Sequence, residues 1–160
     1  MKNNWKERIE SAVDNVKKEF NVKFYGCTEK ELVEIEGKYG SIPNGLRLLY
    51  KLCGRDSWIA FQGIDFGVNK IGYNLQLAKE SLSESKVGLE LPIGSIVFEN
   101  SQGYEFGFAV SGKDGCDDEI YHFTEGDLTF RKDDIGIAEY AEMNLNVENL
   151  KNVLKCMTFR

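Results

Sequence analysis

Apolar side chains recur at helical spacing in the first third of the chain and at alternate positions in its middle. In residues 5–20 they fall every three or four positions, separated by Lys and Glu, at Trp5, Ile9, Ala12, Val13, Val16 and Phe20. This spacing predicts an amphipathic helix. Thr28 and Glu31 then form a capping-box pattern, which predicts that a second helix begins there and ends at Gly40.

The stretch IPNGLRLLYKLCG (residues 42–54) predicts a third helix. Pro43 suits a first helical turn, where a missing N–H costs nothing, and an apolar stripe follows it at Leu46, Leu49, Tyr50 and Cys53. We expect Gly54 to end this helix in the left-handed conformation. A helix of about ten residues does not persist alone in water, so its stripe must pack against the rest of the protein.

After Gly54 the pattern changes to short runs typical of strands. Residues 58–64 (WIAFQGI) are rich in aromatic and branched side chains, which predicts a strand with a bulge at Gly63. A helix over residues 73–85 is expected next. Further short runs then predict an antiparallel meander with strands at 95–99, 104–110, 119–123 and 128–130.

The end of the chain returns to helical spacing. A last helix is predicted to start near Val147, with Leu150, Val153 and Leu154 inward, and residues 133–145 are expected to be partly helical. Helices followed by strands and one closing helix indicate an α+β fold. We therefore expect a single domain over residues 1–160, with N-terminal helices, a mainly antiparallel sheet and a C-terminal helix.

Composition and cysteine spacing predict the number of cores, the cellular location and the state of the thiols. A chain of 160 residues, 42% hydrophobic and 29% charged, is long enough for one core without metal or disulfide staples. Charges interrupt the apolar positions of residues 1–20, so we expect no signal peptide, no membrane association and a cytoplasmic location. The cysteines form no C-x-x-C pair, which predicts reduced, mostly buried thiols and no zinc ribbon: Cys27, Cys53, Cys116 and Cys156.

The net charge of −6 is unevenly distributed along the chain. Residues 99–142 hold twelve Asp or Glu and three Lys or Arg, a net charge of −9, whereas residues 1–98 carry +1 and residues 143–160 carry +2. A concentrated negative field repels nucleic acid and favours a basic protein partner. We therefore expect no direct nucleic-acid binding.

The run TEKELVEIEGKYGSIPNGLRLLYKLCG (residues 28–54) resembles the opening of SUKH superfamily domains, which include a yeast cell-wall-synthesis regulator. The shared features are a Glu-rich helix, a short turn, an Ile-Pro pair and a helix that ends in glycine. The stretch SIVFENSQGYEFGFAV (residues 95–110) is similar to a later hairpin of that family, and the strand EIYHF (119–123) and an acidic stretch follow in the same order. The resemblance covers about residues 28–145.

This resemblance implies a binding module without a catalytic residue set. Many bacterial SUKH proteins look like immunity proteins, which bind and neutralise a cognate toxin, often a nuclease or a deaminase. We therefore expect a non-enzymatic antitoxin without cofactor. The alternative within the same fold is a regulatory or scaffold module, as in the fungal relatives, that recognises a cellular protein.

Two other interpretations, a thiol-dependent hydrolase and a calcium site, have less support from the sequence than a binding module has. Cys116 and the single histidine, His122, could form a thiol-dependent hydrolase, but Asp117 and Asp118 beside the cysteine disfavour the thiolate. The acidic run DGCDDE (114–119) lacks the spacing of a calcium loop. We therefore expect neither catalysis nor a metal site.

The acidic segment is interpreted as a docking face for a basic toxin, with a solvated face as the alternative. A nuclease needs Lys and Arg to hold phosphates, and carboxylates of an inhibitor could cover them. The expected carboxylates are Glu99, Glu105, Asp114, Asp117, Asp118, Glu119, Glu125 and Asp127. Trp58 and Tyr104 are candidate aromatic anchors of this face, with core packing as the alternative for both.

Overall fold

Three helices form the first third of the chain in the computed structural model, which describes residues 4–158. They are α1 (Trp5–Phe20), α2 (Glu29–Tyr39) and α3 (Asn44–Cys53), as the sequence predicts. The predicted capping box is also confirmed: the Thr28 hydroxyl accepts from the N–H of Glu31, whose carboxylate accepts from the N–H of Thr28 at 2.7 Å.

Gly54 ends α3, but its predicted left-handed conformation is wrong. Its φ of −73° and ψ of −16° are right-handed, and its N–H donates to the carbonyl of Tyr50 at 2.9 Å, which continues the helical pattern. A Cβ on this residue would lie only 2.6 Å from the same carbonyl oxygen. Close packing, rather than a left-handed backbone, therefore requires glycine here.

The strand predicted over residues 58–64 is wrong. This segment is a series of turns in which Trp58 (φ 56°) and Phe61 (φ 58°) have left-handed backbone conformations, which a strand does not contain. Ala60 and Phe61 are nevertheless buried in the main core, where the Phe61 ring stacks on Phe66 with centroids 4.0 Å apart. The apolar composition thus reflects burial, which a core-facing loop shares with a strand.

A four-stranded antiparallel sheet follows, with its strands in sequential order. The strands are β1 (Ile96–Ser101), β2 (Glu105–Val110), β3 (Glu119–Thr124) and β4 (Arg131–Gly136), and the short 3₁₀ helix η2 (Lys113–Gly115) joins β2 to β3. The predicted meander is confirmed. The strand predicted at 128–130 is wrong, because residues 128 and 129 form a bend and the last strand begins only at Arg131.

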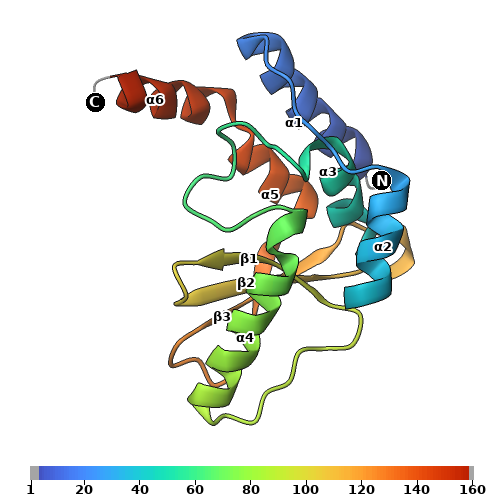
Figure 1. The fold of residues 1–160 in the computed structure, drawn as a ribbon, viewed down its shortest axis with the longest axis vertical. Helices are drawn as coiled ribbons and strands as arrows, with labels where there is room; N and C mark the ends of the chain where they lie inside the picture. Colours follow the sequence, from blue (N-terminus) through green and yellow to red (C-terminus); the bar gives the residue numbers. More distant parts are fainter. Residues whose placement is uncertain (1–3, 159–160) are drawn as a thin grey trace.

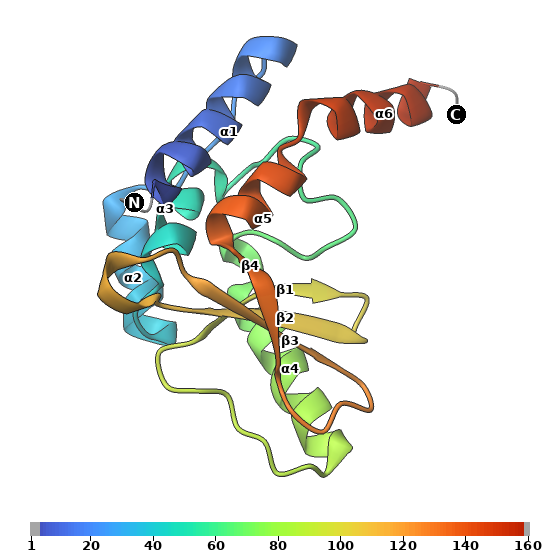
Figure 2. The ribbon, with the colours of Figure 1, turned by 180° about the vertical axis from the view of Figure 1, so that it is seen from behind.

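Helices cover both faces of this sheet (Figures 1 and 2). On one face lies α4 (Ile71–Ser85), which follows the 3₁₀ turn η1 (Val68–Lys70) and packs its Ala78 and Leu82 on Phe106, Phe108 and Phe123. On the other face, helices α1, α3 and α5 (Ile137–Asn144) enclose the main core with Ile96, Phe98, Ala109 and Ile120. The alternation of strand side chains thus divides the apolar residues between two cores.

The chain closes with α5 and α6 (Val147–Thr158), which confirms both helical expectations for this region. Leu150 of α6 is buried, whereas Val153 and Leu154 are half-buried. In both views α6 extends away from the sheet, so it contributes little to the two cores (Figures 1 and 2).

Candidate functional site

The residues expected to form one acidic docking face lie in different parts of the fold. Five are near the end of the sheet where the β1–β2 and β3–β4 turns lie: Glu99, Tyr104, Glu105, Glu125 and Asp127. Four are at or before the start of β3: Asp114, Asp117, Asp118 and Glu119. The six residues of β3 separate Glu119 from the turns by about 17 Å, since a strand rises about 3.4 Å per residue, and Glu99 lies between them at the level of His122.

Asp117 and Asp118 close the N-termini of two helices. Leu46, in the first turn of α3, donates its backbone N–H to Oδ2 of Asp118 at 2.9 Å. Ala138, in the first turn of α5, donates its N–H to Oδ2 of Asp117, also at 2.9 Å. Neither helix has a side-chain cap of its own. The two neighbouring carboxylates therefore tie α3 and α5 to the start of β3.

The environment of this carboxylate pair is buried rather than solvated. Asp118 is only 2% exposed, and Asp117 is half-buried. Burial raises the pKa of Asp118 to about 6, although the N–H of Leu46 favours its ionised form. Burial also raises the pKa of Asp117, against the effect of two backbone N–H donors. The expectation of an exposed face is therefore wrong for Asp118, and Asp117 is only partly accessible.

The remaining residues of the expected face have separate surroundings. Glu119 forms an ion pair with Lys132, with Oε1 and Nζ 2.9 Å apart. Trp58 is half-buried and packs its ring on Phe20, with centroids 4.9 Å apart, so core packing describes it better than an exposed anchor does. Asp114 is an exposed carboxylate in η2, at the opposite end of β3 from the two turns.

A half-buried polar cluster surrounds His122 on the sheet face that packs against α5. Its Nε2 lies 3.1 Å from Oδ2 of Asp133, and its Nδ1 lies 3.5 Å from Oε1 of Glu99 and 3.6 Å from Oε1 of Glu105. Tyr140 of α5 donates its hydroxyl to Oε2 of Glu99 at 2.7 Å. Side chains from all four strands therefore meet at this imidazole, and Tyr140 of α5 joins the cluster through Glu99.

Glu99 belongs to the interior rather than to the docking surface, since it is 8% exposed. Burial raises the pKa of its carboxyl, whereas the Tyr140 hydroxyl and His122 lower it. The same burial, with the neighbouring Glu99 charge, raises the pKa of Tyr140 well above its ordinary value. Glycine at position 107 leaves room for this carboxylate, because a Cβ there would lie 2.6 Å from its Oε1.

The possible Cys–His pair is not assembled in the structure. Cys116 precedes β3, whereas His122 lies near its other end, and no hydrogen bond joins them among the described residues. Among the described residues, the ion-pair partners of the imidazole nitrogens are the carboxylates of Glu99, Glu105 and Asp133. Half of the thiols, rather than most, are buried: Cys27 and Cys53 lie inside, and Cys116 and Cys156 are exposed.

An exposed surface at the turn end of the sheet does gather carboxylates, and we call it the acidic end. A cleft of about 160 Å³ between α4 and the β1–β2 turn is lined by Glu80, Glu84 and Glu125. None of these three forms an ion pair with another described residue. Tyr104 is 65% exposed beside them, and its carbonyl accepts from the N–H of Glu125 at 3.2 Å. The acidic end consists of these four residues.

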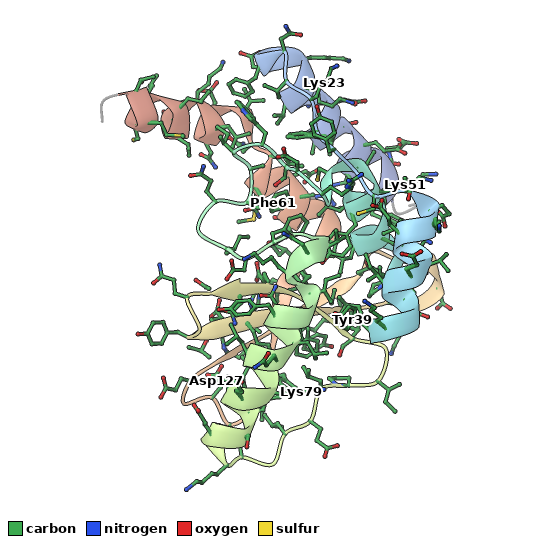
Figure 3. The ribbon with its side chains drawn as sticks, in the orientation of Figure 1. Lys23, Tyr39, Lys51, Phe61, Lys79 and Asp127 are labelled. Carbon is green, nitrogen blue, oxygen red and sulfur yellow. The ribbon has the colours of Figure 1, made fainter. Side chains whose placement is uncertain are left out.

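Two further expected residues lie at the same end of the sheet but are partly neutralised. Arg131 donates to Oε2 of Glu105 at 3.1 Å and to Oδ2 of Asp127 at 3.0 Å. The N–H of Thr124 and the Arg131 guanidinium lower the pKa of Asp127, which is labelled in Figure 3. Both carboxylates are therefore already partnered by Arg131, so they offer less free charge than the acidic end.

The contribution of α4 to this surface was not anticipated from the sequence. Glu80 and Glu84 are four positions apart in the helix predicted over residues 73–85, which places them on the same helical face. They lie outside the strongly acidic segment 99–142. Counting charge by segment therefore missed them, whereas the helical spacing could have placed them together.

The comparisons with known proteins do not assign the chain to a group. No protein-family model matches it, and no curated protein matches it. Residues 4–158 hold no group of three or more His, Cys, Asp or Glu side chains placed to bind a metal ion. Within the same range, no helix has both the length and the apolar character needed to cross a bilayer.

Replacing Tyr140 by phenylalanine should lower the free energy of unfolding by about 1.5 kcal/mol at pH 7, because Glu99 loses a hydrogen bond inside the protein. The loss should be smaller at pH 4, since a protonated Glu99 depends less on that donor. Urea unfolding followed by circular dichroism measures both values. Tyr104→Phe removes an exposed hydroxyl and should leave stability unchanged; equal effects of the two variants would contradict the buried role of Tyr140.

Proposed function

We propose that this protein is a non-catalytic, SUKH-like immunity protein, which captures one basic toxin at its acidic end. The observation that carries the proposal is the cleft with three carboxylates, Glu80, Glu84 and Glu125, that have no cationic partner among the described residues. The order of helices, antiparallel sheet and closing helix agrees with the resemblance of residues 28–145 to SUKH domains.

Capture of a toxin at this surface requires complementary charge and does not require a catalysed reaction. The unpaired carboxylates draw Lys and Arg side chains of the toxin, and complementary charge speeds the encounter between the two proteins. Tyr104 adds an exposed aromatic ring beside those charges, and such rings often supply much of the binding energy at an interface. A toxin that uses its basic groove to hold phosphates is inhibited when that groove is covered.

The partner to test is a toxin domain at the C-terminus of a large secreted protein, sought in the gene immediately upstream of this one. The recombinant domain should bind this protein and lose its toxicity at equimolar ratio. Its association rate should fall about tenfold between about 0.01 M and 0.15 M salt, over which the Debye length shortens from about 30 Å to about 8 Å. Surface plasmon resonance measures that rate.

Three results would contradict the proposal in different ways. Failure to bind the toxin domain would remove the immunity role. Binding that leaves the toxin fully active would favour a regulatory or scaffold module instead. If the association rate does not change with salt, the protein still captures the toxin, but the acidic end is not its docking surface.

A further inference from the structure

The segment between α4 and β1 has an unpaired backbone. Residues 87–91 alternate between half-buried and exposed positions, and Val87, Leu89 and Leu91 pack on the second core beneath α4. Gly88 has a φ of 73° and belongs to the turn after α4, so the alternation is typical of an extended strand over residues 89–91. The N–H and C=O groups of residues 88–91 make no hydrogen bond with any other described residue. A strand-like edge is therefore open to pairing.

A groove of about 630 Å³ runs between this segment and one flank of α4. Its α4 side is formed by Lys79, Leu82, Ser83 and Lys86, and its other side by residues 88–91. Figures 1 and 3 show the segment running beside α4, with Lys79 on the flank that faces it. The volume falls in the range of common ligand sites, and the leucines supply an apolar floor.

The charges of the groove select for an acidic occupant. Lys79 and Lys86 form no ion pair with another described residue. Glu90 is the one carboxylate in the lining of this groove, so the lysines dominate its field. This flank of α4 thus has the opposite charge from the Glu80 and Glu84 flank.

We propose that this groove binds an extended segment of a partner protein in which apolar and acidic side chains alternate. The peptide backbone pairs with the extended residues 89–91, as in strand addition to an open edge. Alternate side chains then point in opposite directions, so apolar ones lie on Leu82, Leu89 and Leu91 while acidic ones reach Lys79 and Lys86. A helical occupant would leave the open N–H and C=O groups unpaired.

This site is separate from the acidic end and does not depend on the proposed immunity role. The probe is a fluorescein-labelled octapeptide of alternating glutamate and valine, measured by fluorescence anisotropy with the intact protein. We expect a dissociation constant of about 0.1 mM, as is common for a short peptide that must be ordered on binding. Absence of detectable binding at about 1 mM peptide would overturn the proposal.

Two matched comparisons test the mode of binding. The Lys79→Glu/Lys86→Glu variant should bind the peptide about tenfold more weakly, whereas Lys30→Glu/Lys38→Glu on α2, with the same change in net charge, should bind as the wild type does. The same peptide with every backbone nitrogen methylated cannot donate along either edge and should not bind. Equal losses in the two variants, or full binding of the methylated peptide, would overturn the site.

Discussion

Replacing Asp118 by alanine is expected to lower the free energy of unfolding by about 3 kcal/mol at pH 5. The substitution removes the carboxyl oxygen that accepts the N–H of Leu46 and leaves the first turn of α3 buried without a cap. An unsatisfied buried donor at a helix N-terminus costs about 1–3 kcal/mol, and the lost packing adds to it. Urea unfolding followed by circular dichroism gives the value.

The matched control is Asp114→Asn, which removes an exposed charge from the same connection between β2 and β3 and keeps a side chain that tolerates the left-handed backbone there (φ 52°). Its effect should stay within about 0.5 kcal/mol, as for most surface substitutions. Similar losses for the two variants would show that the Asp118 carboxylate is not a special contact. That result would also remove the reason for excluding Asp117 and Asp118 from the docking surface.

The contribution of Asp118 to the free energy of unfolding should decrease as the pH rises. The folded-state pKa of about 6 lies above the ordinary value of 3.8, so the folded protein holds this proton more tightly than the unfolded chain does. The stabilisation from Asp118 is therefore complete below about pH 4 and is lost as the pH rises through about 6. In Asp118→Asn, the free energy of unfolding should fall less over this interval than it does in the wild type.

Replacing Gly26 by alanine should destabilise the protein by about 3 kcal/mol, at the upper end of the usual cost of overpacking. A Cβ at this position would overlap the carbonyl oxygen of Lys51 near the end of α3. Neighbouring backbone bonds fix this contact, because Cys27 donates its N–H to the carbonyl of Tyr50 at 3.0 Å. The loop that contains Gly26 and the end of α3 cannot move apart without breaking that hydrogen bond. Thermal and urea unfolding measure the loss.

Gly37 of α2 offers the opposite case in the same half of the molecule. A Cβ there would meet nothing within 4 Å, and the residue is exposed within a helix. Gly37→Ala should therefore raise the free energy of unfolding by up to about 1 kcal/mol, because alanine loses less backbone freedom on folding. Destabilisation by Gly37→Ala, or a neutral Gly26→Ala, would contradict the packing described for these helices.

Local rules explain why much of the fold was predictable. The capping box of Thr28 and Glu31 and the apolar stripe of α3 depend on residues within a few positions of one another. The alternation along β2 similarly records which side chains face each core. Such signals describe a helix or strand without knowledge of the rest of the chain.

The incorrect predictions have a common cause. Contacts between residues that are distant in sequence decide which side chains are buried. The carboxylate that caps α3 comes from Asp118, 72 residues from Leu46, whereas capping rules consider only neighbouring residues. The aromatic run at 58–64 is buried as a loop because Phe61 stacks within the main core. Counting the charge of a segment likewise cannot separate buried Glu99 from exposed Glu125.

The acidic residues consequently divide into two functions within one fold. Asp117, Asp118 and Glu99 satisfy donors inside the protein, where removal of the carboxylate costs stability. Glu80, Glu84 and Glu125 line an exposed cleft, where reversal of charge should change binding rather than folding. The proposed docking surface is thus smaller than the acidic segment and includes part of α4.

The most direct test of the central claim compares two triple variants that change the net charge equally. Glu80→Lys/Glu84→Lys/Glu125→Lys alters the acidic end, and Glu34→Lys/Asp114→Lys/Glu139→Lys alters exposed carboxylates elsewhere. Isothermal titration calorimetry with the cognate toxin domain should show about 100-fold weaker binding for the first variant and less than about threefold for the second, with both folded by circular dichroism. Equal losses, or none at the acidic end, would contradict the account.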